Sequence, residues 1–159
     1  MKKLVLFYSF EGNTKYIAEN IADAVEADVL ELKPVKDIKS NGFMKYLWGG
    51  KQVVTGSKPE LQEISANFEE YDFIYFGTPV WAFNFAPAFN TFFSNYKIEG
   101  KKVALFCCDG GTIGKTFINM REQLKDNTIV GEIEFKEPIK GDKEKAMLVR
   151  KWAEDMIKK

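Results

Sequence analysis

Apolar and polar residues occur in blocks along the chain, and five short apolar blocks are each bounded by turn-forming or charged residues. Most of these blocks are apolar at nearly every position, which is typical of strands that are buried on both faces. The pattern therefore predicts five β-strands, at residues 4–8, 28–32, 73–76, 103–108 and 128–135.

Between most of the predicted strands, apolar residues recur at the three- and four-residue spacing of amphipathic helices. This spacing predicts helices at residues 14–25, 86–96, 113–124 and 143–157. Strands and helices thus alternate, which indicates a parallel sheet covered on both faces by right-handed crossover connections.

The connection from residue 33 to residue 71 departs from this alternation. One or two helical turns are predicted around residues 43–47, and we expect Gly49 and Gly50 to interrupt them. A connection of this length is often a functional loop, and a plain crossover with surface decoration is the alternative.

The composition restricts the fold and the partners. A chain of 159 residues is long enough for one hydrophobic core, so we expect a single domain over residues 1–159. Lys and Arg number 23, as do Asp and Glu, so no net charge attracts the protein to nucleic acid or to an anionic membrane. The sequence shows no signal peptide and no apolar run long enough to cross a bilayer, so we expect a cytoplasmic protein.

The residue types also limit the chemistry. Histidine is absent, which excludes Ser-His and Cys-His nucleophilic catalysis and histidine-ligated metals. The two cysteines, Cys107 and Cys108, are adjacent at the end of an apolar run, an arrangement that disulfide frameworks and zinc sites do not normally use. We therefore expect both cysteines to serve in packing, and we expect neither a catalytic side chain nor a metal site.

In an open parallel α/β sheet, ligands bind beyond the carboxyl ends of the strands, near the position where the strand order reverses. The loop after the first predicted strand, SFEGNT, offers side-chain donors from Ser9, Asn13 and Thr14, and Gly12 allows a tight turn. The next helix directs its N–H groups and the positive end of its dipole to the same place, which suits a small phosphate monoester. The loop lacks the lysine of a P-loop and the three glycines of a dinucleotide fingerprint, so ATP, GTP and NAD are poorly supported. An ordinary turn with Ser9 or Asn13 as the helix cap is the alternative.

Two further loops should meet the first one at this edge of the sheet. The stretch GTPVWAFNFAP places Val80, Trp81 and Phe83 directly after a buried strand. An aromatic ring there can stack on a flat heteroaromatic ligand, or it can pack beneath the following helix. The stretch CCDGGTIGKT contains three glycines, which let a ligand approach the backbone closely.

These motifs carry a resemblance to a known family. The stretches YSFEGNT, FGTPVWAFNFAPAFNTFF and FCCDGGTIG, in this order and spacing, resemble the flavodoxin family, and the likeness extends over nearly the full length of the chain. The resemblance implies an α/β, flavodoxin-like three-layer sandwich with a five-stranded parallel sheet in the order 2-1-3-4-5. It also implies that FMN is bound where that order reverses.

By the same resemblance, particular residues would hold FMN. The phosphate would be bound by Ser9, Phe10, Glu11, Gly12, Asn13 and Thr14, with Phe10 and Glu11 contributing backbone N–H groups. The isoalloxazine ring would be lined by Pro79, Val80, Trp81 and Asn84, and its opposite edge would be bordered by Cys108, Asp109, Gly110, Gly111 and Gly114.

The resemblance implies an electron-transfer protein that shuttles electrons between a reductase and an acceptor enzyme, with the flavin supplying the redox chemistry. An FMN-dependent NAD(P)H:quinone-type oxidoreductase with a small-molecule acceptor is one alternative. A flavodoxin-shaped binding module without flavin is another.

Three positions depart from the family pattern. Glu11 stands where the phosphate loop usually has a hydroxyl residue, so its carboxylate must point to solvent or pair with a cation such as Lys15. Ala82 replaces a glycine, and we expect it to resist a positive φ. The DGGTI stretch lacks the aromatic residue that commonly covers the outer face of the ring, so that face would be open or covered by an aromatic such as Trp48.

Overall fold

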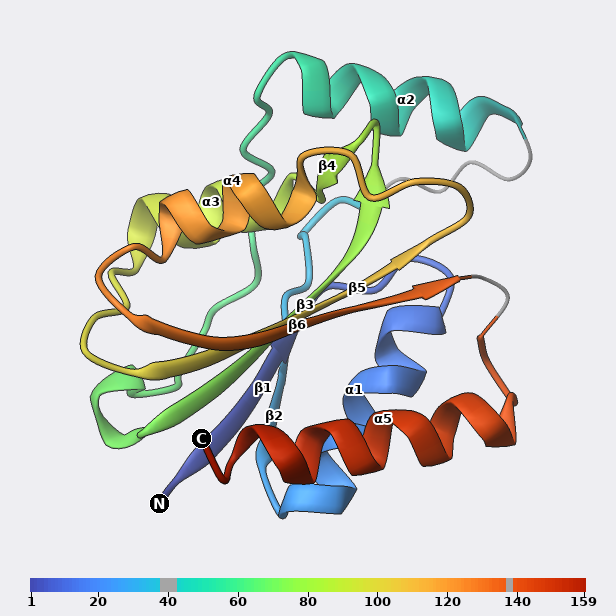
Figure 1. Ribbon diagram of the computed structural model, residues 1–159. Helices are drawn as coiled ribbons and strands as arrows, with labels where there is room; N and C mark the ends of the chain where they lie inside the picture. The colour runs from blue at the N-terminus through green and yellow to red at the C-terminus, as the bar shows by residue number, and fades with distance from the viewer. Residues whose placement is uncertain (38–42, 137–138) are drawn as a thin grey trace.

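The computed structural model describes residues 1–37, 43–136 and 139–159, without the side chains of residues 43–48. Within these residues, five parallel strands form the central sheet (Figure 1), in the order β2-β1-β3-β5-β6. They are β1 (Lys3–Phe7), β2 (Asp28–Glu31), β3 (Phe73–Trp81), β5 (Lys102–Asp109) and β6 (Thr128–Lys136). Because β4 lies outside this path, the strand order is the predicted 2-1-3-4-5, and the predicted fold is confirmed.

Helices cover both faces of the sheet (Figure 1). They are α1 (Asn13–Val25), α2 (Phe43–Val54), α3 (Ala88–Asn95), α4 (Thr116–Gln123) and α5 (Lys143–Met156), with a 3-10 turn at Phe68–Glu70. One face is covered by α1 and α5, and the other by α3 and α4. The helix α2 lies on the side of α3 and α4, above the β3–β4 hairpin. In the described residues, no helix has the length and apolar character needed to span a membrane.

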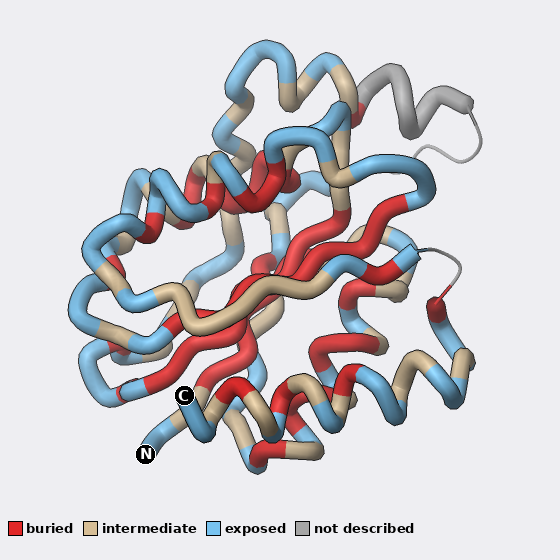
Figure 2. Tube along the Cα trace, viewed as in Figure 1, coloured by how far each residue is buried: buried red, intermediate tan, exposed pale blue. Residues whose placement is uncertain are grey.

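The core consists of two apolar clusters, one on each face of the sheet. Figure 2 shows the buried residues concentrated in the strands and recurring along the helices that cover them. Successive side chains of a strand point to opposite faces. In β1, Leu4 and Leu6 therefore pack on the α3–α4 side, while Val5 and Phe7 pack against α1 and α5. The central strands are buried on both faces, which explains why their sequences are apolar nearly throughout.

The third strand differs from the prediction. It was expected at residues 73–76, but β3 continues to Trp81 and then pairs in antiparallel fashion with β4 (Asn84–Phe85). Val80 is opposite Phe85, and Trp81 is opposite Asn84. The segment predicted as an aromatic loop is therefore a β-hairpin, and the described sheet has six strands.

The turn of this hairpin corrects a second expectation. Ala82 has a φ of 45° and Phe83 a φ of 64°, so Ala82 does adopt the left-handed conformation. Positive φ at both central residues characterises the hairpin turn whose twist matches the flanking strands. The start of α4 secures the turn, because the Lys115 N–H donates to the Phe83 carbonyl at 2.8 Å. Gly114 lies so close that a Cβ there would be 2.4 Å from the Phe83 Cβ.

We expect Ala82→Gly to stabilise the protein without ligand. The change removes roughly 1–2 kcal/mol of left-handed strain and adds about 0.5–1 kcal/mol of glycine entropy cost, for a net gain of up to roughly 1.5 kcal/mol. Urea unfolding measures this difference. The matched control is Ala146→Gly in the interior of α5, which should lower stability by up to about 1 kcal/mol. If both variants lost stability equally, the turn at Ala82 would not be strained.

The predicted interruption at Gly49 and Gly50 is wrong, because α2 continues through both glycines to Val54. The other predicted helices agree to within three residues at each end. The largest shift is at α4, predicted from residue 113 and observed from Thr116. Gly114 has a φ of 52°, which an α-helix cannot accommodate, so the helix begins after it.

Candidate functional site

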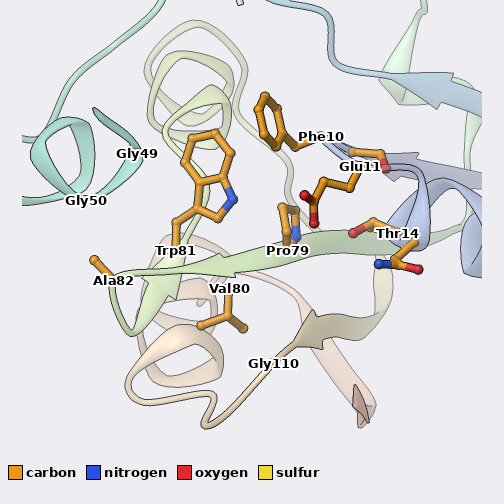
Figure 3. A pocket seen from close by; sticks show the side chains of 12 residues that line it. Phe10, Glu11, Thr14, Gly49, Gly50, Pro79, Val80, Trp81, Ala82 and Gly110 are labelled. Carbon is orange, nitrogen blue, oxygen red and sulfur yellow. The ribbon is translucent and has the colours of Figure 1, made fainter. Parts of the chain in front are cut away.

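A cleft opens at the carboxyl ends of β1, β3 and β5, where the strand order reverses (Figure 3). Its empty volume is about 750 Å³, which includes space open to solvent. Nine residues predicted from the sequence line it, namely Ser9, Phe10, Glu11, Asn13, Thr14, Pro79, Val80, Trp81 and Gly110. Sequence reasoning missed the other three lining residues, Gly49, Gly50 and Ala82.

The loop Ser9–Thr14 forms one end of the cleft, at the N-terminus of α1. Ser9 Oγ accepts hydrogen bonds from the N–H of Gly12 at 3.2 Å and from the N–H of Lys15 at 3.1 Å. Gly12 has a φ of 95° and is the N-terminal cap of α1, whose first turn contains no acidic residue. A helix N-terminus carries the positive end of the helix dipole and can hold the oxygens of a phosphate. The residues present therefore fit a phosphate group.

Two polar residues of this loop have other contacts. Asn13 Oδ1 accepts hydrogen bonds from the backbone N–H of Ile139 at 3.1 Å and of Lys140 at 3.0 Å, so Asn13 joins this loop to the segment before α5. Lys15 pairs with Glu31 at 3.4 Å (Nζ to Oε2). Glu11 is exposed to solvent, but its side chain also lines the cleft (Figure 3).

The other end of the cleft is aromatic. Trp81 contacts Tyr8 and Phe10 edge to face, with ring centroids 5.6 Å and 5.5 Å apart. Its indole points toward α2, where it contacts the backbone of Gly49, whereas Val80 points to the opposite side of β3, toward Gly110 (Figure 3). A rigid indole and an aliphatic side chain at one cleft end suit a flat, largely apolar ring.

Tyr8 packs against Trp81 at the aromatic end and is itself held by a hydrogen bond. Its hydroxyl donates to both carboxylate oxygens of Asp37, at 3.0 Å and 3.1 Å. Burial, and then the charge of Asp37, raise the pKa of Tyr8, so this phenol stays protonated at physiological pH. The pair fixes the ring that Trp81 packs against.

The third loop contributes Gly110 to the cleft and is shaped by an ion pair between buried Asp109 and exposed Lys136. The Asp109 side chain is only 2% exposed, and its Oδ2 accepts from the Gly111 N–H at 3.0 Å and from Lys136 Nζ at 2.8 Å. The hydrogen bond to Asp109 raises the pKa of Lys136. Lys136, which also pairs with Glu134, faces Asp109 Oδ2, while Asp109 Oδ1 is buried without a hydrogen-bond partner among the described residues.

Six of the predicted site residues do not line the cleft: Gly12, Asn84, Cys108, Asp109, Gly111 and Gly114. Gly12, Asp109 and Gly111 shape loops that do. Asn84 Oδ1 accepts from Asn119 Nδ2 at 3.0 Å, which ties the hairpin to α4, and Gly114 supports the hairpin turn. The cofactor roles assigned to these residues stay predictions.

Both cysteines are fully buried, on opposite faces of the sheet, where they pack in the two core clusters. Burial raises the pKa of Cys107, so its thiol stays protonated. The side chain of Trp48, suggested above as a cover for the ring, lies outside the described residues. Among the residues that are described, no group of three or more Cys, Asp or Glu could hold a metal ion.

Comparison with known proteins agrees with this geometry. A protein-family model described as flavodoxin matches residues 2–156. A curated relative, the flavodoxin-like domain-containing protein BilS of Clostridioides difficile (strain CD3), is 31% identical over 137 residues. The match covers 82% of this chain and 63% of BilS, so the chain spans less than two thirds of that protein's length.

Two crystal structures show the same fold. A flavoprotein of Lactobacillus acidophilus NCFM in complex with FMN is 25% identical, with a TM-score of 0.72 and coverage of 92% of this chain and 98% of that one. A protein of Bacteroides eggerthii DSM 20697 is 23% identical, with a TM-score of 0.78 and coverage of 98% of both chains. With a family model matched over nearly its whole length and a cleft where the strand order reverses, this chain belongs to the flavodoxin family, whose cofactor is FMN.

Proposed function

We propose that the protein binds FMN in this cleft and transfers electrons between a reductase and an acceptor enzyme. The observation that carries the proposal is that a single cleft joins the loop at Ser9–Thr14, where α1 begins, to an aromatic end at Trp81. A flavin mononucleotide has a phosphate at one end and a flat ring at the other. The FMN complex of the similar Lactobacillus acidophilus flavoprotein supports the same assignment.

In this function, the chain binds and orients the cofactor. The first loop and the N-terminus of α1 hold the phosphate, while Val80 and Trp81 position the ring and exclude water from part of its surface. The bound flavin supplies the redox chemistry, so no nucleophile or general base is required from the protein. This agrees with a chain that contains no histidine.

A second candidate is an FMN-dependent NAD(P)H:quinone-type oxidoreductase with a small-molecule acceptor. The glycine loop after β5 favours it, because the GGTIGK stretch has no aromatic side chain and Gly110 and Gly111 are both exposed. A ring bordered by such a loop can be reached by a small molecule from that side. Access of this kind permits direct hydride transfer from a nicotinamide to the flavin.

An absorption spectrum tests the proposal. The purified protein is measured before and after addition of FMN, and then during anaerobic incubation with NADPH alone. We expect bound flavin that NADPH leaves oxidised and that an added flavodoxin reductase reduces. Direct bleaching by NADPH would instead establish the oxidoreductase. Protein that binds no flavin under either condition would reject both functions and favour a flavin-free binding module.

A further inference from the structure

We propose that α2 forms one wall of the flavin site, and that Gly50 lies against the ring of the bound cofactor and must lack a side chain for this reason. The inference rests on the proposed function, since it concerns the same cleft. It adds a position that determines which ring the cleft admits.

The first reason is the sequence of α2 itself. Gly49 and Gly50 are adjacent in the interior of a twelve-residue helix. Glycine is the least favourable residue in a helix interior apart from proline, because it loses the most backbone entropy. A pair of glycines in this place weakens the helix, and a packing partner or a ligand for each of them would account for that cost.

Gly49 has a packing partner within the protein. A Cβ at position 49 would lie 3.3 Å from Cε3 of Trp81, and 3.6 Å from Cδ2 and Cζ3 of the same indole. The missing side chain therefore lets the helix backbone lie directly on the indole. This contact accounts for the first glycine of the pair.

Gly50 has no such partner among the described residues. A Cβ at position 50 would have no described atom within 4 Å, yet Gly50 lines the cleft. Neither close packing nor a positive φ explains a glycine here. The open space beside its backbone is part of the cleft, so we assign the bound ligand as the partner of Gly50.

The position of Gly50 in the cleft identifies the part of the ligand that it meets. Gly49 and Gly50 lie at the end of the cleft that holds Trp81 and Ala82, whereas Thr14 lies at the other end (Figure 3). The wall formed by α2 therefore faces the flat ring and not the phosphate. A backbone surface without a Cβ allows a planar ring to approach closely.

The test uses Gly50→Ala and Gly50→Leu, with Val54→Leu as the matched control. Val54 is on the same helix but is 83% exposed and outside the cleft. Calorimetric titration of the flavin-free proteins measures the affinity for FMN and for riboflavin, and thermal unfolding without flavin measures stability. Riboflavin has the same ring without the phosphate, so it separates the two ends of the site.

We expect Gly50→Ala to raise the Tm of the flavin-free protein by about 2–4 °C, because alanine favours the helix and fits the open space. We expect Gly50→Leu to lower the affinity for both flavins by the same factor, about 5- to 150-fold, because its side chain fills the space that the ring needs. Val54→Leu should leave both affinities unchanged. A Gly50→Ala protein that is more stable, together with a Gly50→Leu protein that binds both flavins more weakly, is a pair of results that a purely structural glycine does not produce.

Three results would overturn the inference. Gly50→Leu with wild-type affinity would show that α2 does not contact the ligand. If Gly50→Leu lost affinity for FMN but not for riboflavin, Gly50 would lie beside the phosphate. Lower stability of the flavin-free Gly50→Ala protein would show that the fold itself needs this glycine. If the wild-type protein bound neither flavin, the proposed function itself would be wrong. The three results above instead concern variants of a wild-type protein that does bind flavin, so the two kinds of failure are distinguishable.

Discussion

Replacing Trp81 by alanine should weaken FMN binding by about 1–3 kcal/mol, or roughly 5- to 150-fold, which is the usual effect of losing a large buried aromatic contact. In the flavin-free protein the indole is already held by Tyr8, Phe10 and the backbone of Gly49. Its position is therefore set before the ligand arrives, and little of the binding energy is spent on ordering it. Trp81→Phe should keep part of the affinity, because it retains an aromatic ring.

Calorimetric titration with FMN and with riboflavin measures this effect without relying on flavin fluorescence. Trp152→Ala is the matched control, because Trp152 is half-buried on α5, on the other face of the sheet, against Tyr75. We expect Trp152→Ala to lower stability and to leave flavin affinity unchanged. Equal affinities of Trp81→Ala and the wild-type protein would remove Trp81 from the ring site.

The second large expected effect is a loss of stability when Gly77 is replaced. Gly77 is buried in β3, paired with Phe7 on one side and Phe106 on the other. A Cβ at position 77 would lie 2.0 Å from Cζ of Phe106, a ring that is fully buried. Gly77→Ala should therefore destabilise the protein by about 3 kcal/mol or more, the upper range for overpacking a core.

Urea unfolding measures this loss, and two further variants isolate its cause. Gly110→Ala should be close to neutral, because a Cβ there would meet no described atom within 4 Å. The double variant Gly77→Ala with Phe106→Leu should recover part of the loss, because the smaller side chain makes room for the added methyl group. A loss below about 1 kcal/mol for Gly77→Ala would mean that Phe106 moves aside at little cost.

The sequence predicted the strands well because a sheet covered by helices on both faces requires strands that are apolar on both sides. The third strand was predicted to end at residue 76, whereas β3 continues through Pro79 to Trp81. Proline is normally excluded from interior strands, so its presence here is not expected from sequence. The carbonyl of Gly77 accepts from the Tyr8 N–H, so that side of β3 faces β1. Pro79, two residues later, faces the same side beyond the last paired residue of β1, so its missing N–H costs no ladder hydrogen bond.

The hairpin turn and α2 were mispredicted for a related reason. Local preference opposes a left-handed Ala82 and a helix through Gly49 and Gly50. Residues distant in sequence decide both cases, because Lys115 and Gly114 secure the turn and Trp81 packs on Gly49. Sequence reasoning found most of the cleft because its loops follow buried strands. It missed Gly49 and Gly50 because no local signal places α2 beside the third strand.

The hydrogen bonds accepted by Asn13 also affect the order in which parts of the protein fold. They join residues separated by 126 and 127 positions in the sequence. Contacts of such separation form late, because a long intervening chain must first be ordered. On the ribosome, the first loop emerges early. The two hydrogen bonds to Asn13 can form only after residue 140 has left the exit tunnel. We therefore expect cofactor capture to follow completion of the sheet, so that a nascent chain folds without FMN to guide it.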